Sequence, residues 1–128
     1  MHSLTPKRPI YLNLLQIRLP IAGVLSIAHR VTGLLLVLSV PLLTLLLQQS
    51  LAGAEGFAAV VAQLHSWPGR IALLLALWAL LHHLLAGIRY LLIDLDIGVE
   101  RPRYRYSAWL VLLVAPLLAL LAVWGLNR

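Results

Sequence analysis

Three long apolar runs dominate this sequence, and they constrain its fold more than any other feature. They cover about residues 21–47, 70–95 and 107–126. A helix needs roughly 20 mainly apolar residues to cross the hydrocarbon core of a bilayer, and each run meets that length. The chain has 128 residues, of which 62% are hydrophobic and 11% charged, so one water-soluble core cannot hide so much apolar surface. The sequence predicts an all-α integral membrane protein, a single domain over residues 1–128 with three transmembrane helices.

The segments between the runs have the composition of loops and membrane interfaces. Residues 48–56 are rich in glutamine and glycine and are expected to form the first loop, and the mildly apolar residues 57–65 are expected to lie at the membrane surface. The sequence Trp67-Pro68-Gly69 is a plausible helix start. Trp109 and Trp124 stand near the two ends of the third run, where an aromatic belt is expected at each interface.

The basic residues indicate how the chain is oriented. One side of the membrane receives eight of them, and the opposite side receives two, Arg70 and Arg128. The eight are Lys7, Arg8, Arg18, Arg30, Arg89, Arg101, Arg103 and Arg105. Because basic residues concentrate on the cytoplasmic side, the N-terminus and second loop are predicted to face the cytoplasm, as in a multi-pass protein of the bacterial inner membrane. The basic residues form no continuous stripe, so lipid and not nucleic acid is the predicted partner for the net charge of +6.

Polar side chains interrupt the first two apolar runs at one depth. The first run contains Ser26, His29 and Arg30 near its start, and the second contains a histidine pair and Arg89 near its end. Antiparallel neighbouring helices bring these two groups to the same level of the bilayer. An ionisable residue in the middle of a membrane helix costs roughly 2.5–3.5 kcal/mol on insertion scales. Such residues are therefore candidates for a functional site.

The spacing in the first run favours a ligand-binding stripe. Ser26, Arg30 and Gly33 stand at i, i+4 and i+7 on one helix face, with His29 beside them. A hydroxyl, a cation and an imidazole together suit a ligand head that accepts hydrogen bonds, such as a quinone or a propionate. Each residue also has a structural explanation. Arg30 can extend to the interface, Ser26 can bond to a carbonyl of its own helix, and His29 can be satisfied in a helix contact.

The second run carries His83 and, one helical turn later, Gly87. A glycine at this spacing lets a flat group approach the backbone, and imidazole is a common axial ligand of haem iron. His82 points about 100° away from its neighbour, so one helix cannot present both rings to the same iron. The chain has no cysteine, which excludes thiolate ligation, iron–sulfur ligation and covalent c-type haem in it. Asp94 is left with two possible partners, Arg89 and another subunit.

These motifs together resemble those of the cytochrome b556 subunits of succinate dehydrogenase. The first block reads Ser26-Ile27-Ala28-His29-Arg30-Val31-Thr32-Gly33, and the second reads His83-Leu84-Leu85-Ala86-Gly87-Ile88-Arg89, followed by Asp94. Arg8-Pro9 and Ile17-Arg18-Leu19-Pro20 precede them. Both blocks stand in the expected order on the expected helices.

The resemblance implies a role for each site residue. His83 would be one axial ligand of haem b, and a histidine of a second, smaller anchor subunit would be the other. Ser26 and Arg30 match the residues that contribute to the ubiquinone site. His29, with Arg30, would lie near the haem propionates. The three helices would then pack with the partner anchor subunit into a haem-binding bundle, and no role follows for His82.

The resemblance also implies partners and a reaction. Succinate would be oxidised at a flavin in a flavoprotein subunit, and an iron–sulfur subunit would carry the electrons to ubiquinone at the anchor, as in respiratory complex II. The chain alone would not be catalytic. Two alternatives stay open: a fumarate reductase anchor, with electrons running the other way and menaquinone as the partner, and a non-redox membrane adaptor or small transporter.

Overall fold

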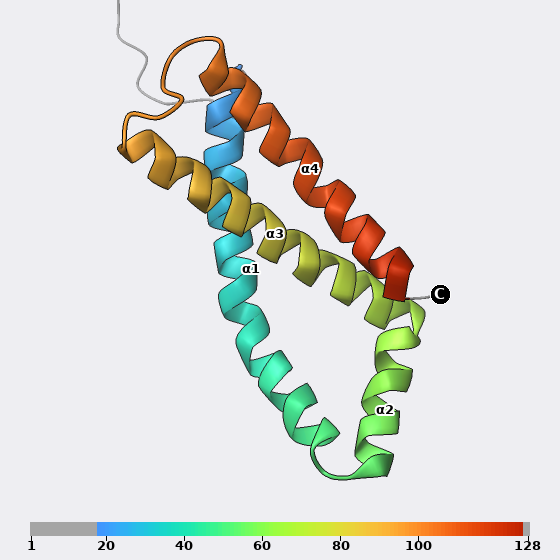
Figure 1. The fold of residues 1–128 in the computed structure, drawn as a ribbon. Helices are drawn as coiled ribbons and strands as arrows, with labels where there is room; N and C mark the ends of the chain where they lie inside the picture. The colour runs from blue at the N-terminus through green and yellow to red at the C-terminus, as the bar shows by residue number, and fades with distance from the viewer. Residues whose placement is uncertain (1–17, 127–128) are drawn as a thin grey trace, which may run out of the picture.

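The computed structural model describes residues 18–126, and this part of the chain is built from helices without any strand. Figure 1 shows their arrangement. The helices are α1 (Ile21–Ser50), α2 (Ala54–His65), α3 (Trp67–Asp94) and α4 (Arg103–Leu126). The Arg8-Pro9 and Ile17 positions of the motif, and the basic residues Lys7 and Arg128, lie outside the described residues.

Three of the helices, α1, α3 and α4, are long and apolar enough to cross a membrane. This confirms the predicted all-α transmembrane fold. The helices begin or end beyond the predicted spans, with α1 reaching Ser50, α3 beginning at Trp67 and α4 beginning at Arg103. A helix continues through the polar interface for as long as its backbone hydrogen bonds are satisfied, whereas hydropathy marks the apolar part alone.

The short helix α2 joins the far ends of α1 and α3 (Figure 1). It contains residues 57–65, which the sequence predicts to lie at the membrane surface, and it begins three residues before them, at Ala54. Gly53 precedes it with φ of 122°, a conformation that favours glycine. Ser66 then begins α3, because its Oγ accepts a hydrogen bond from the Gly69 backbone N–H at 3.2 Å and Pro68 occupies the first turn, an arrangement typical of helix starts.

Helix α3 is the central element, since it packs against both α1 and α4. It crosses α1 and lies along α4 (Figure 1). Small side chains allow the close approach of α3 and α4, as is usual between membrane helices. The buried positions of α3 are Ala79, His82, Ala86 and Arg89, and those of α4 are Ala108, Val111, Ala115 and Ala119. The core cluster Leu25, Ala86, Ala108 and Val111 joins all three long helices.

Many large apolar side chains of α1 are strongly exposed. Val37 is 68% exposed and Leu38 is 64% exposed, and Leu45 near the far end is 62% exposed. From the crossing point, α1 and α3 diverge toward the end where α2 connects them (Figure 1). A soluble protein rarely leaves such large apolar patches uncovered. In a membrane these surfaces contact lipid or another subunit.

A buried arginine ties the end of α3 to the start of α4. Arg89 is 5% exposed. Its Nε donates to Ser107 Oγ at 2.9 Å, and its Nη2 donates to the Tyr104 carbonyl oxygen at 3.0 Å. The guanidinium also lies 4.7 Å from the centre of the Tyr104 ring. Arg89 is one of the two possible partners of Asp94, but its side chain bonds to α4 instead. Asp94 is exposed at the end of α3.

Candidate functional site at the helix crossing

Two of the polar residues predicted to share one depth are in direct contact where α1 and α3 cross. The imidazole rings of His29 and His83 stack with their centroids 4.0 Å apart and an angle of 10° between their planes. The antiparallel arrangement of α1 and α3 produces this meeting, as the sequence predicts. The site therefore begins as a histidine pair formed by two different helices.

A glycine of the facing helix lies beside each ring, and Gly33 is the one that makes room for its ring. Each histidine is followed four residues later by a glycine, Gly33 after His29 and Gly87 after His83. Because the helices are antiparallel, each ring lies beside the glycine of the opposite helix. A Cβ added to Gly33 would lie 2.8 Å from His83 Cε1, and one added to Gly87 would lie 3.8 Å from His29 Nε2.

The role of Gly33 in receiving the His83 ring is not expected from the sequence, where Gly33 belongs to the stripe of Ser26 and Arg30. One signal that points to it is the repeated spacing. His-x-x-x-Gly occurs in both α1 and α3, and two copies of this pattern on antiparallel helices place each histidine opposite a glycine. The pattern works as a helix-crossing motif.

A backbone hydrogen bond fixes the orientation of the His83 ring. His83 Nδ1 lies 3.0 Å from the carbonyl oxygen of His29. A carbonyl oxygen accepts, so Nδ1 carries the proton and donates it, and the lone pair of the neutral ring is then on Nε2. Histidines that bind metals usually donate their other ring N–H to a carbonyl or a carboxylate in this way. His83 therefore has the tautomer and the support that an iron ligand requires.

Two further polar atoms at the crossing are buried and have no hydrogen-bond partner among the described residues. They are His29 Nε2 and the hydroxyl oxygen of Tyr90. The Tyr90 ring meets the His29 ring edge-on, with centroids 5.2 Å apart. Buried polar groups in native proteins are almost always satisfied, so an acceptor supplied by a ligand fits here. The carboxylate of a haem propionate has this chemistry. Tyr90 is a residue for which the sequence suggests no role.

Ser26 and Arg30 remain available for contacts outside this chain. The hydroxyl groups of Thr32, Ser39 and Thr44 all bond back to carbonyl groups of α1. In contrast, Ser26 Oγ has no hydrogen bond within residues 18–126, so the back-bonding alternative is not seen there. Arg30 is exposed, as expected both for a side chain that extends to the interface and for one that contacts a ligand.

His82 faces away from the histidine pair. It is 1% exposed and lies on the face of α3 that carries Ala79, Ala86 and Arg89, toward α4. Its ring centroid is 5.8 Å from that of Trp78, and its Nε2 has no partner among the described residues. The rotation of about 100° between successive residues therefore separates the neighbouring histidines, as the sequence predicts.

The histidine pair is not a metal site built from protein ligands alone. In the part of the chain that the structure describes, no group of three or more His, Cys, Asp or Glu side chains could hold a metal ion. A haem iron needs fewer protein ligands, because the porphyrin supplies four nitrogens and the protein adds only axial ligands. His83 can supply one such ligand from this chain.

The chain is similar to known membrane subunits over most of its length. Residues 5–122 match the model of the family described as succinate dehydrogenase/fumarate reductase transmembrane subunit. The succinate dehydrogenase cytochrome b556 subunit of Coxiella burnetii is 39% identical over 120 residues, which cover 92% of this chain and 96% of that protein. The subunit of the same name from Paracoccus denitrificans is 35% identical over 116 residues, covering 91% of this chain and 89% of the relative.

Proposed function

Since this chain belongs to the succinate dehydrogenase/fumarate reductase transmembrane subunit family, we propose that it is the haem b-binding membrane anchor subunit of a succinate dehydrogenase. In this role it also forms part of the ubiquinone-reduction site. The observation that carries the proposal is the His29–His83 pair, in which the hydrogen bond from His83 Nδ1 leaves the Nε2 lone pair available. The basic residues near the starts of α1 and α4 favour a cytoplasmic location for that end of the bundle.

In the proposed complex, His83 and a histidine of the second anchor subunit would hold the haem. When bound, the haem supplies reversible one-electron transfer. The residues of this chain position the ligand. The carbonyl of His29 orients the His83 ring, and the missing side chain at Gly33 gives that ring its space. His29 and Arg30 would donate hydrogen bonds to the propionates.

The proposed quinone site uses the free side chains of α1. Ubiquinone takes up two electrons and two protons to become ubiquinol. Arg30 would stabilise negative charge on a quinone oxygen, and the Ser26 hydroxyl would donate a hydrogen bond to a carbonyl, as fixed donors do at developing oxyanions. The chain has no cysteine, so the iron–sulfur clusters that deliver electrons belong to a partner subunit, and the flavin belongs to another.

Arg30→Ala is expected to slow quinone reduction far more than succinate oxidation. Removing one donor from a charge-stabilising site costs on the order of 10²-fold in rate. Reduction of an artificial acceptor by the flavoprotein does not pass through the quinone site and should be nearly unchanged. Both rates are measured on the purified complex, with Arg70→Ala as a control that removes the same charge at the other end of the bundle. An equal loss of both rates would indicate an assembly defect and contradict the quinone role.

A visible difference spectrum tests the proposed function as a whole. The tagged chain is purified with its partner subunits in mild detergent, and the succinate-reduced sample is compared with the air-oxidised one. We expect a sharp b-type band on addition of succinate. If no band appears with either succinate or dithionite, the chain is a membrane adaptor without haem.

A further inference from the structure

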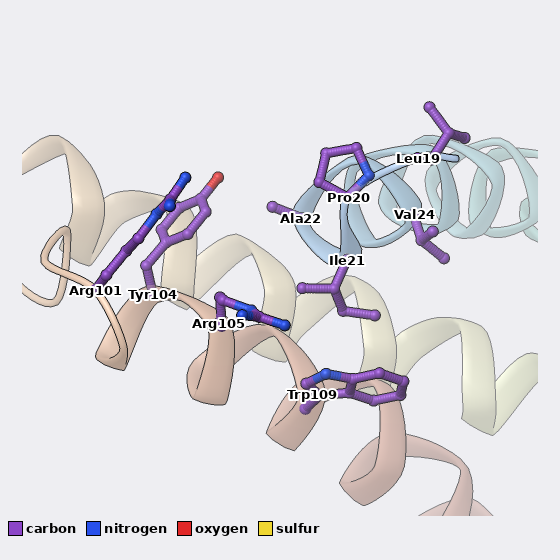
Figure 2. Close-up of a pocket in the computed structure, with 9 residues that line it drawn as sticks. All are labelled: Leu19, Pro20, Ile21, Ala22, Val24, Arg101, Tyr104, Arg105 and Trp109. Carbon is purple, nitrogen blue, oxygen red and sulfur yellow. The ribbon is translucent and has the colours of Figure 1, made fainter. Parts of the chain in front are cut away.

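An open cleft lies between the starts of α1 and α4, at the end of the bundle near the α3–α4 loop (Figure 2). Its volume is about 600 Å³. The α1 side contributes apolar residues, among them Ile21 and Val24. The other side contributes Arg101, Tyr104, Arg105 and Trp109. The cleft therefore combines an apolar wall with two guanidinium groups.

The residues of the histidine pair and of the proposed quinone site do not line the cleft. Val24 lines it, whereas Ser26 belongs to the quinone stripe. Ala22 also lines the cleft and lies one helical turn before Ser26 on the same face of α1, so the cleft reaches to about one turn from the quinone stripe.

The side chains of the cleft have the chemistry of a membrane–water interface. Arg101 and Arg105 are both exposed, and neither side chain forms an ion pair or hydrogen bond with another residue of the described range 18–126. Arg105 extends from α4 toward the start of α1 (Figure 2). Tyr104 and Trp109 carry amphipathic rings of the kind that lies at the headgroup level of a bilayer. The two charges are thus free to bind an anion from the lipid layer.

We propose that this cleft binds one anionic phospholipid. The phosphate would lie against Arg101 and Arg105, and an acyl chain would follow Trp109, Ile21 and Val24 between α1 and α4. Basic pockets between membrane helices are suited to anionic lipid headgroups. The site requires no haem and does not depend on the proposed function.

Charge complementarity selects this occupant over two others. The preceding segment of the chain, residues 1–17, contains Lys7 and Arg8 and no acidic residue, so it would repel the two guanidinium groups. A second copy of this chain would bring the same arginines to the contact. A lipid phosphate provides the missing negative charge and also supplies the apolar chain that the rest of the cleft needs.

The test compares lipid retention by three forms of the complex. The complex is purified with its partner subunits, stripped of lipid by detergent exchange, and titrated with phosphatidylglycerol or phosphatidylcholine. Retained lipid is then counted by native mass spectrometry. The forms are wild type, R101Q/R105Q and R103Q, the last removing a charge at the first residue of α4, which does not line the cleft. An arginine near an anionic lipid surface contributes about fivefold in binding, so the double variant should retain phosphatidylglycerol on the order of 25-fold more weakly.

Several results would overturn the proposal. They are equal retention of phosphatidylglycerol and phosphatidylcholine by the wild type, an equal loss in R103Q, or no loss in R101Q/R105Q. The last would be expected if a partner subunit covers the two arginines. If the double variant does not assemble, the proposal is tested by quenching of tryptophan fluorescence in the wild-type complex. Phosphatidylglycerol with brominated chains should quench the fluorescence component that Trp109→Phe removes, and brominated phosphatidylcholine should not. Equal quenching by both lipids would contradict the site.

Discussion

Replacing His83 by alanine is expected to remove the b-type band from the dithionite-reduced spectrum of the purified complex. We propose that the lone pair on His83 Nε2 binds the haem iron. The stacked His29 ring belongs to a different helix. Alanine offers iron no ligand, so the expected haem content falls from about one per complex toward zero, since two axial ligands are usual for electron-transfer haems. The measurement is the absorbance of the haem band relative to the flavin of the same preparation.

His82→Ala is the matched control for this experiment. It removes an imidazole of the same size from the neighbouring position of α3, but from the face that packs on α4. The substitution leaves a small cavity beside Trp78, and large-to-small changes of this kind cost about 2–5 kcal/mol. Some loss of thermal stability is expected, with the haem band retained. A band that survives in His83→Ala and is lost in His82→Ala would reverse the assignment.

A methyl group at Gly33 is expected to disrupt the crossing of α1 and α3. In Gly33→Ala the new Cβ would lie 2.8 Å from His83 Cε1, well inside the roughly 3.5–4.0 Å of an ordinary carbon–carbon contact. The His83 ring cannot easily move away, because it is stacked on His29 and bonded to the His29 carbonyl. Overpacking of this kind costs about 1–3 kcal/mol. The thermal midpoint of the complex and its haem content should therefore both fall.

Gly87→Ala provides the comparison for the crossing. Its added Cβ would lie 3.8 Å from His29 Nε2, an ordinary van der Waals distance. The thermal midpoint should stay at the wild-type value. Its haem content then reports a separate property, namely whether a flat ligand approaches the backbone of α3 at this point. If the two variants have the same thermal midpoint, the helices adjust at the crossing, and the histidine pair is not held by its glycines.

The sequence predicts the membrane spans because length and apolarity alone decide which segments can cross a bilayer. It predicts the helix ends only in part. The start of α3 at Trp67 agrees with the helix start predicted at Trp67-Pro68-Gly69, whereas α4 begins at Arg103, a polar residue that suits a loop as well as a helix turn. Their helical state depends on local features, such as the Ser66 cap, which satisfies a backbone N–H at the start of α3.

At the histidine site, too, the sequence predicts some features and not others. The choice of His83 over His82 follows from the rotation between neighbours on one helix, which any helical residue obeys. The stack with His29 requires the depth at which α1 and α3 cross, and a single helix carries no information about that depth. The partners of Arg89 cannot be predicted from the sequence for the same reason. Ser107 and Tyr104 lie on α4, and the sequence suggests the nearby carboxylate of Asp94 instead.

The parallel stacking of the histidine rings has a consequence for metal selectivity. An imidazole lone pair lies in the plane of its ring, and the two ring planes here are nearly parallel, with centroids 4.0 Å apart. Lone pairs in separate parallel planes do not converge on one point, so a single ion cannot be in line with both rings. Zinc and copper bind imidazole more strongly than iron(II) does, and a pair of convergent histidines in a membrane would collect them. Face-to-face stacking instead makes this pair a poor chelator and keeps it from being loaded with the wrong metal.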